Sequence, residues 1–117
     1  MKNFKELIVW HRAVDFVALV YGVTKEFPKE EQYGLIGQIR RSVVSIPSNI
    51  AEGHMRTTAK DFRQFLSIAR GSCAEVETQV IIAHKLKYLD DTKYQILIIK
   101  IEEIAKMLSA LSASLMR

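Results

Sequence analysis

The stretch QIRRSVVSIPSNIAEGHMR, residues 38–56, has the pattern of a buried helix but contains residues that a plain hydrophobic core avoids. Its apolar residues recur at steps of three and four, the period of a helix with one buried face. They are Ile39, Val43, Ile46 and Ile50. Pro47 lies among them, and a proline inside a helix removes a backbone hydrogen bond at a cost of about 3 kcal/mol. The stretch therefore predicts either one bent helix or two shorter helices that meet near residue 47.

Helical periodicity extends from this stretch toward the amino terminus. The central helix is expected over residues 30–55, after Pro28, and another helix over residues 7–25. The main apolar stripe of that first helix is expected to be Trp10, Ala13, Val14, Val17, Val20 and Tyr21. Further apolar residues extend the apolar surface around most of the helix circumference. This helix is therefore either covered on two sides by its own bundle or contacts a partner chain.

Two more helices are expected toward the carboxyl terminus. Thr58 and Asp61 have the spacing of a capping box, which places a helix over residues 59–88. Asp90 or Asp91 is expected to cap the fourth helix. Its apolar seam, with coiled-coil steps, is Tyr94, Leu97, Ile101, Ile104, Leu108, Leu111 and Leu115. Four long helices joined by short turns predict an all-α, antiparallel up-down-up-down four-helix bundle, a single domain over residues 1–117.

The sequence carries no recognisable targeting signal. Charges are spread through the amino-terminal residues, and no uncharged run approaches the ~20 residues that a membrane-spanning helix needs. The single Cys73 has no partner for an internal disulfide, which fits a reducing compartment. We expect a cytoplasmic protein without a membrane partner.

The positive charge is concentrated in one third of the chain. Residues 38–70 hold six basic and two acidic residues, six minus two giving +4, while the rest holds eleven of each sign and sums to zero. The six candidate nucleic-acid-binding residues are Arg40, Arg41, Arg56, Lys60, Arg63 and Arg70. Such a patch attracts phosphates. The alternative is that some of these cations pair with Glu52, Glu75 and Glu77 inside the bundle.

The sequence offers no arrangement typical of catalysis or of a metal site. His11, His54 and His84 are far apart and are not spaced with acidic residues or cysteine as in known metal motifs. Cys73 falls on the apolar stripe of its helix and is interpreted as a core residue. The glycine-rich phosphate loop and the Glu-x-x-His pairs of di-iron bundles are also missing. No catalytic residue, metal or cofactor is predicted.

A few polar residues fall among apolar ones and need partners, because burying an unpaired polar group is costly. Arg40 is one of them, and Asn49, Glu52 and Glu75 are the others. We interpret the last three as a structural polar network that fixes helix register. The alternative is that they form part of a ligand or nucleic-acid contact surface.

Several short runs of the sequence resemble a known family. They are VWHRA, the FP turn, YGL, QIRRS, SIPSNIAEG and DFRQFLSIARGS followed by Glu75. These runs resemble the bacterial four-helix bundle proteins encoded in the intervening sequences of large-subunit ribosomal RNA genes. The resemblance covers Phe4 to Tyr88, and the fourth helix matches only as a generic amphipathic helix.

The resemblance implies a homopentamer, a barrel of bundles around a central channel. It also implies kinship with the accessory variability protein of diversity-generating retroelements, a basic pentamer that binds reverse transcriptase and nucleic acid. No catalytic activity is attached to the family. Its signature residues fall here on Trp10, Arg40, Arg41, Ser45, Pro47, Asn49, Glu52, Gly53, Arg70, Gly71, Ser72 and Glu75.

Two functions follow as hypotheses. The first is a non-enzymatic, ring-forming bundle that binds structured nucleic acid, RNA before DNA, through the basic surface of its second and third helices, with a reverse transcriptase-like protein as a further partner. Because few aromatic residues interleave with the cations, phosphate contact rather than base readout is expected. The alternative is a protein–protein assembly or adaptor module, in which the basic residues form ion pairs between subunits.

Overall fold

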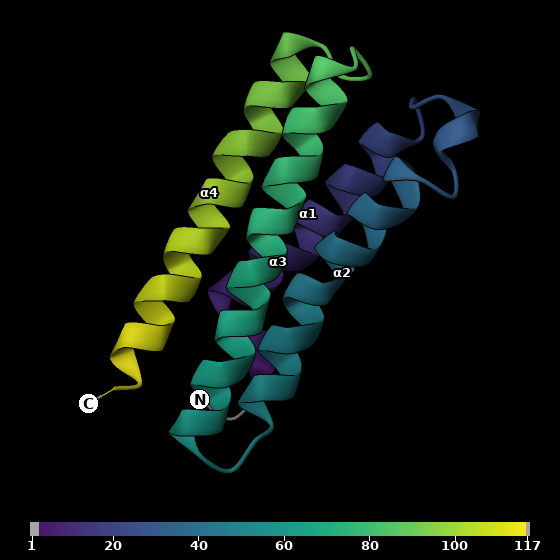
Figure 1. Cartoon of the computed structure of the whole chain (residues 1–117). Coiled ribbons are helices and arrows are strands. Elements are labelled where there is room, and N and C mark those ends of the chain that lie inside the picture. The colour runs from purple at the N-terminus through teal and green to yellow at the C-terminus, as the bar shows by residue number, and fades with distance from the viewer. Residues whose placement is uncertain (1–2, 117) are drawn as a thin grey trace.

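The structure is a computed structural model that describes residues 3–116, and it is a four-helix bundle. The long helices are α1 (Ile8–Thr24), α2 (Leu35–His54), α3 (Ala59–Lys85) and α4 (Asp91–Ser114). They run alternately up and down, so that α1 begins and α4 ends at the same end of the bundle (Figure 1). Residues 3–116 contain no strand, and none of their helices is long and apolar enough to span a membrane. The predicted all-α, up-down-up-down architecture is confirmed.

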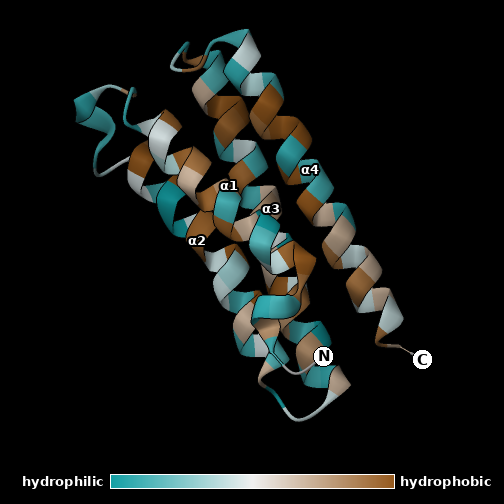
Figure 2. Ribbon diagram, turned by 180° about the vertical axis from the view of Figure 1, so that it is seen from behind, coloured by the Kyte–Doolittle hydropathy of each residue, from teal (hydrophilic) through white to brown (hydrophobic). Residues whose placement is uncertain are grey.

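The helices are arranged in chain order around a single core. Each helix packs on its neighbours in the chain, and α1 also meets α4, which places α1 diagonally across from α3. The α2–α3 pair packs most closely and the α1–α4 pair least closely. The bundle measures 45 × 24 × 20 Å, and apolar bands recur along every helix instead of being confined to one (Figure 2). All four helices therefore contribute to the core, but the seams between them differ in tightness.

The buried row of α1 differs from the predicted stripe. The residues that face the core are Val9, Ala13, Phe16, Val20 and Thr24. Val14 and Tyr21 were expected in the core, but they are 38% and 37% exposed. The reason is that α1 packs on α2 but only loosely on α4, so its buried arc is narrow and the remaining apolar residues stay at the surface.

The second long helix begins at Leu35 and not at residue 30, because a short 3-10 turn, η2 (Lys29–Glu31), precedes it. One carboxylate oxygen of Glu31, Oε1, accepts a hydrogen bond from the backbone N–H of Leu35 at 3.1 Å. The other, Oε2, accepts one from the hydroxyl of Tyr88 at 2.9 Å, which raises the pKa of Tyr88. Glu31 therefore caps the start of α2 and connects it to the turn that follows α3.

The third helix ends at Lys85, three residues earlier than expected. Lys87 has a φ of 65°, in the left-handed region, and its N–H donates to the carbonyl of His84 at 3.0 Å. The N–H of Tyr88 donates to the carbonyl of Ala83 at 2.9 Å. These two bonds form a Schellman motif, which closes a helix without needing a proline or glycine in the sequence.

The predicted amino-terminal caps of the last two helices are present. The hydroxyl of Thr58 accepts a hydrogen bond from the N–H of Asp61 at 3.1 Å. The side chain of Asp90 accepts one from the N–H of Lys93 at 2.8 Å, so Asp90 rather than Asp91 caps α4.

The second long helix continues without a break through Pro47, which is buried. Near the end of α2, a Cβ added to Gly53 would lie 2.6 Å from Cβ of Phe65 and 3.0 Å from Cδ1 of Phe62. The absence of a side chain at Gly53 therefore permits the close crossing of α2 and α3. Gly71 of α3 differs, because an added Cβ would meet nothing within 4 Å.

We predict opposite effects for alanine at these two glycines. Gly53→Ala should lower the free energy of unfolding by about 1–3 kcal/mol, because the methyl group would force the two helices apart. Gly71→Ala should raise it by up to about 1 kcal/mol, because alanine is the better helix former and the space is open. Urea denaturation followed by circular dichroism measures both. Equal effects of the two substitutions would contradict the close crossing at Gly53.

Candidate nucleic-acid interface

The bundle uses Arg40 internally. Its Nε donates to the hydroxyl of Thr24 at 3.0 Å, and its Nη2 donates to the carbonyl of Tyr21 at 3.3 Å. The guanidinium also lies 4.4 Å from the centre of the Tyr21 ring, within the range of a cation–π contact. Thr24 is buried and its hydroxyl donates to the carbonyl of Val20. Arg40 therefore joins α2 to the end of α1.

Two more of the six basic residues also contact their own chain. Arg56 pairs with Glu52 at 2.9 Å and lies 4.8 Å from the centre of the Phe65 ring. Arg63 donates from Nη1 to the carbonyl of Leu115 at 3.1 Å, which ties the start of α3 to the end of α4. The ion pair offsets the charge of Arg56, and the bond to Leu115 occupies one of the donors of Arg63.

The other three basic residues are Arg41, Lys60 and Arg70, and all are exposed. Within residues 3–116 their side chains form neither a hydrogen bond nor an ion pair. They do not form one continuous patch. Arg41 lines a hollow between α2 and α3, whereas Arg70 lines a groove between α3 and α4 with Lys106. The single basic surface expected from the sequence is thus divided between two sides of α3.

The predicted polar network is present only in part. The side-chain amide of Asn49 donates to the hydroxyl of Ser45 at 3.0 Å, and that hydroxyl lies 2.7 Å from the hydroxyl of Ser72 on α3. Glu52 is not part of it, since it is exposed and pairs with Arg56. Glu75 is exposed too and makes no hydrogen bond within residues 3–116. Both carboxylates lie on the solvent side of their helices, so the network consists of Asn49 and two serines.

A hollow of about 380 Å³ lies over this network, and we call it the polar trough. It is lined by Gln38, Arg41, Ser42, Ser45, Glu75 and Gln79, all of them polar. Gln79 donates to the hydroxyl of Ser42 at 3.3 Å, while its own carbonyl oxygen is buried without a partner. Arg41 and Ser45 also line a second hollow, toward Tyr21. Sequence reasoning selected Arg41, Ser45 and Glu75 but did not place them together, because they come from two helices.

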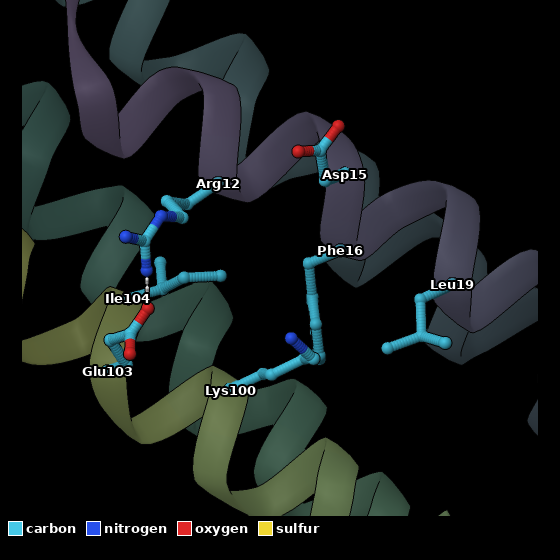
Figure 3. Close-up of a pocket in the computed structure, with 7 residues that line it drawn as sticks. All are labelled: Arg12, Asp15, Phe16, Leu19, Lys100, Glu103 and Ile104. Carbon is cyan, nitrogen blue, oxygen red and sulfur yellow. Dashed lines mark hydrogen bonds and ion pairs between the residues drawn. The ribbon is translucent and has the colours of Figure 1, made fainter.

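A pocket of about 390 Å³ lies in the loose seam between α1 and α4 (Figure 3). Phe16, Leu19 and Ile104 give it apolar walls. Arg12 of α1 reaches Glu103 of α4 across it and forms an ion pair. Both partners are half exposed, so the pair contributes little to stability, about 0–1 kcal/mol. Nothing in the sequence pattern indicated this pocket.

Another hollow is the groove between α3 and α4, about 590 Å³ in volume. Small residues, among them Gly71 and Ala105, form part of its wall, and Arg70 and Lys106 give it a basic side. Cys73 lies at its base and is buried. Burial, with a smaller contribution from Glu77, raises the pKa of Cys73 to about 12. Because only the thiolate is a strong nucleophile, Cys73 has the properties of a packing residue.

The three histidines have separate environments. His84 lies 2.7 Å from a carboxylate oxygen of Asp91 and stacks on Tyr94 with ring centroids 3.9 Å apart. His54 meets the edge of Phe62, and His11 lies beside Trp10. Within residues 3–116, no three side chains of histidine, cysteine or acidic residues gather closely enough to hold a metal ion.

Comparison with known proteins places this chain in a family. The model of the 23S rRNA-intervening sequence protein family matches residues 5–110, nearly the whole bundle. The chain belongs to this family. No curated protein matches.

A solved structure shares the fold of this family member. It is the crystal structure at 1.70 Å of a protein of unknown function from the S23 ribosomal protein family of Bacteroides thetaiotaomicron. The two chains are 24% identical, with a TM-score of 0.84 over 90% of this chain and 98% of the other.

We predict that the adjacent residues Arg40 and Arg41 differ in their effect on stability. Arg40→Ala should lower the free energy of unfolding by about 1–2 kcal/mol, because it removes charge-assisted hydrogen bonds and a stacked ring contact. Arg41→Ala should change it by no more than about 0.5 kcal/mol, as expected for an exposed side chain without a partner. Thermal and urea unfolding of both variants provide the measurement. A destabilised Arg41→Ala variant would contradict the separation of roles.

Proposed function

We propose that this member of the 23S rRNA-intervening sequence protein family is a non-enzymatic protein that assembles with copies of itself into a ring and binds structured RNA by phosphate contact. The observation that carries the proposal is the set of three exposed cations, Arg41, Lys60 and Arg70, which the bundle does not use. Arginine and lysine side chains left free on a chain of net charge +4 favour association with a polyanion.

The family supports RNA over other polyanions. Its name refers to sequences that interrupt 23S rRNA genes, and the solved relative is assigned to a ribosomal protein family although its function is unknown. The free cations lie on helices, away from any cluster of aromatic rings that would stack bases. Their chemistry therefore suits contact with phosphates of a folded RNA.

Exposed apolar side chains support assembly. On α3, Ile68 and Ile82 are 52% and 42% exposed, and on α4, Ile99 is 61% exposed with Ile96 one turn away at 42%. Ile96 and Ile99 are neighbours on one face of α4, and adjoining exposed apolar residues are typical of an interaction surface. A ring requires two different faces of the subunit to meet, and α3 and α4 each supply apolar positions.

A second candidate function is a protein–protein assembly or adaptor module without a nucleic-acid ligand. The same apolar residues favour it, and a reverse transcriptase-like protein is one partner that the resemblance suggests. Under this alternative, Arg41 and Arg70 would form ion pairs with neighbouring subunits, and their loss would change the oligomer instead of RNA binding.

We predict that removing the free cations weakens RNA binding. The triple variant Arg41→Ala, Lys60→Ala, Arg70→Ala should bind a labelled, structured ribosomal RNA fragment less tightly, with the slope of log affinity against log salt reduced by roughly 2 to 3. Fluorescence anisotropy at several salt concentrations measures both quantities.

The matched control replaces three exposed lysines near the α3–α4 turn, Lys85, Lys87 and Lys93, by alanine. It removes the same charge and should leave most of the affinity intact. An RNA affinity and salt slope equal to those of the wild type in the first variant would exclude the free cations as the interface.

We predict that a charge at Ile99 disrupts assembly. Ile99→Glu places a carboxylate on the exposed apolar face of α4 and should shift the solution mass toward that of a single 13.4 kDa chain. Sedimentation velocity measures the mass. Gln95→Glu is the control, because it adds the same charge at an exposed position one turn earlier on α4. If the wild-type chain itself sediments as a monomer, the ring is excluded.

A further inference from the structure

The polar trough between α2 and α3 has a composition unlike that of a phosphate site. Arg41 comes from α2 and Glu75 from α3, and both line the same hollow. A carboxylate beside an arginine repels phosphate, so the trough is a poor place for the RNA backbone. Its remaining groups are two amides and two hydroxyls, which both donate and accept hydrogen bonds.

The fold leaves the charged groups of the trough without partners. Within residues 3–116, neither Arg41 nor Glu75 forms an ion pair or a side-chain hydrogen bond. Gly37 lies one turn before Arg41, and a Cβ there would stand 3.2 Å from Nη1 of Arg41. The guanidinium therefore folds back along α2 over Gly37, at the ridge between the trough and the hollow toward Tyr21, both of which Arg41 lines.

One acceptor in the trough is buried and unused. The carbonyl oxygen of Gln79 has no hydrogen-bond partner, although the amide nitrogen of the same side chain donates to Ser42. A buried acceptor without a donor is costly, and each such group in a folded protein requires an explanation. Because this oxygen is buried, a ligand in the trough would meet the exposed carboxylate of Glu75 as its acceptor instead.

We propose that the polar trough binds a guanine base of the RNA, an inference that rests on the proposed RNA binding. Guanine carries two adjacent donors, N1–H and the N2 amino group, which the carboxylate of Glu75 can accept together. Its neighbouring Hoogsteen edge carries the acceptors O6 and N7, which suit the two-pronged guanidinium of Arg41. Adenine, cytosine and uracil do not combine a pair of adjacent donors with this acceptor edge.

The geometry is suited to an unpaired base. Arg41 comes from α2 and Glu75 from α3, so the two side chains can approach two different, neighbouring edges of one purine. The volume of about 380 Å³ lies within the range of small-molecule sites, roughly 300–1,000 Å³. RNA presents single bases in this way from loops and bulges, where their edges are free. Lys60 and Arg70 would then hold the backbone, while Arg41 acts with the trough to select the base.

The test compares three labelled RNA hairpins that differ in one loop nucleotide: guanosine, adenosine or inosine, which lacks the N2 amino group. By fluorescence anisotropy, the wild-type protein should bind the guanosine hairpin roughly tenfold more tightly than the adenosine hairpin, with inosine between them. Glu75→Gln should lose most of this preference while still binding the adenosine hairpin, because an amide offers one donor where the carboxylate offered only acceptors.

Glu77→Gln is the matched control. It makes the same charge change on the same helix, but Glu77 lies on the α4 side of α3 and outside the trough. This variant should keep the tenfold preference. Sedimentation velocity of both variants shows whether either substitution changes the oligomer.

Four outcomes would overturn the guanine site. Equal affinity of the wild-type protein for the three hairpins would exclude it and leave RNA binding intact. If Glu75→Gln and Glu77→Gln raised the affinity for all hairpins equally, Glu75 would affect RNA binding only through its negative charge and not by contacting a base. A changed oligomer mass in Glu75→Gln alone would assign the trough to an interface between copies of this chain. Lack of binding to every hairpin at low salt would exclude the proposed RNA binding as well.

Discussion

The close crossing of α2 and α3 at Gly53 determines what the rest of the α2–α3 seam can hold. At this point Phe65 and Phe62 approach the backbone of α2 so closely that a methyl group would not fit. Farther along the same seam the helices remain near enough for the hydroxyls of Ser45 and Ser72 to lie 2.7 Å apart. Short polar side chains can bridge helices only at such a distance. The α2–α3 seam is thus apolar at Gly53 and is bridged by side-chain hydrogen bonds of serine and asparagine next to the polar trough.

The adjacent residues Arg40 and Arg41 show how a single step along a helix changes what a side chain contacts. Successive residues on a helix point about 100° apart. Arg40 turns toward α1 and stacks on Tyr21, whereas Arg41 folds back over Gly37 of its own helix and keeps its donors free. A count of charges along the sequence treats them alike. In the fold, half of the six basic residues between 38 and 70 contact their own chain, so the charge available to a partner is smaller than the count indicates.

The α1–α4 seam is packed more loosely than the α2–α3 seam. An exposed ion pair bridges it, and a pocket remains beneath. The fold is shared with a solved structure at only 24% identity, which is consistent with architecture set by helix length and apolar spacing rather than by individual side chains. Within such a fold, the surface is free to carry the apolar residues and the unpaired cations on which the proposed assembly and RNA binding depend.

The sequence by itself determined the class of fold, the number of helices and the cap at Thr58, and it narrowed the cap of the fourth helix to Asp90 or Asp91, because apolar period and capping chemistry act over neighbouring residues. The apolar seam of α4 was also correct at its centre, where Leu97, Ile101, Ile104 and Leu108 are buried. Local patterns did not give the start of α2, where Glu31 bonds to Tyr88, since 57 residues separate them. They also failed for the polar network and for the division of the basic residues. Each of these depends on which side of a helix meets which neighbour, and only the packing of the four helices decides that.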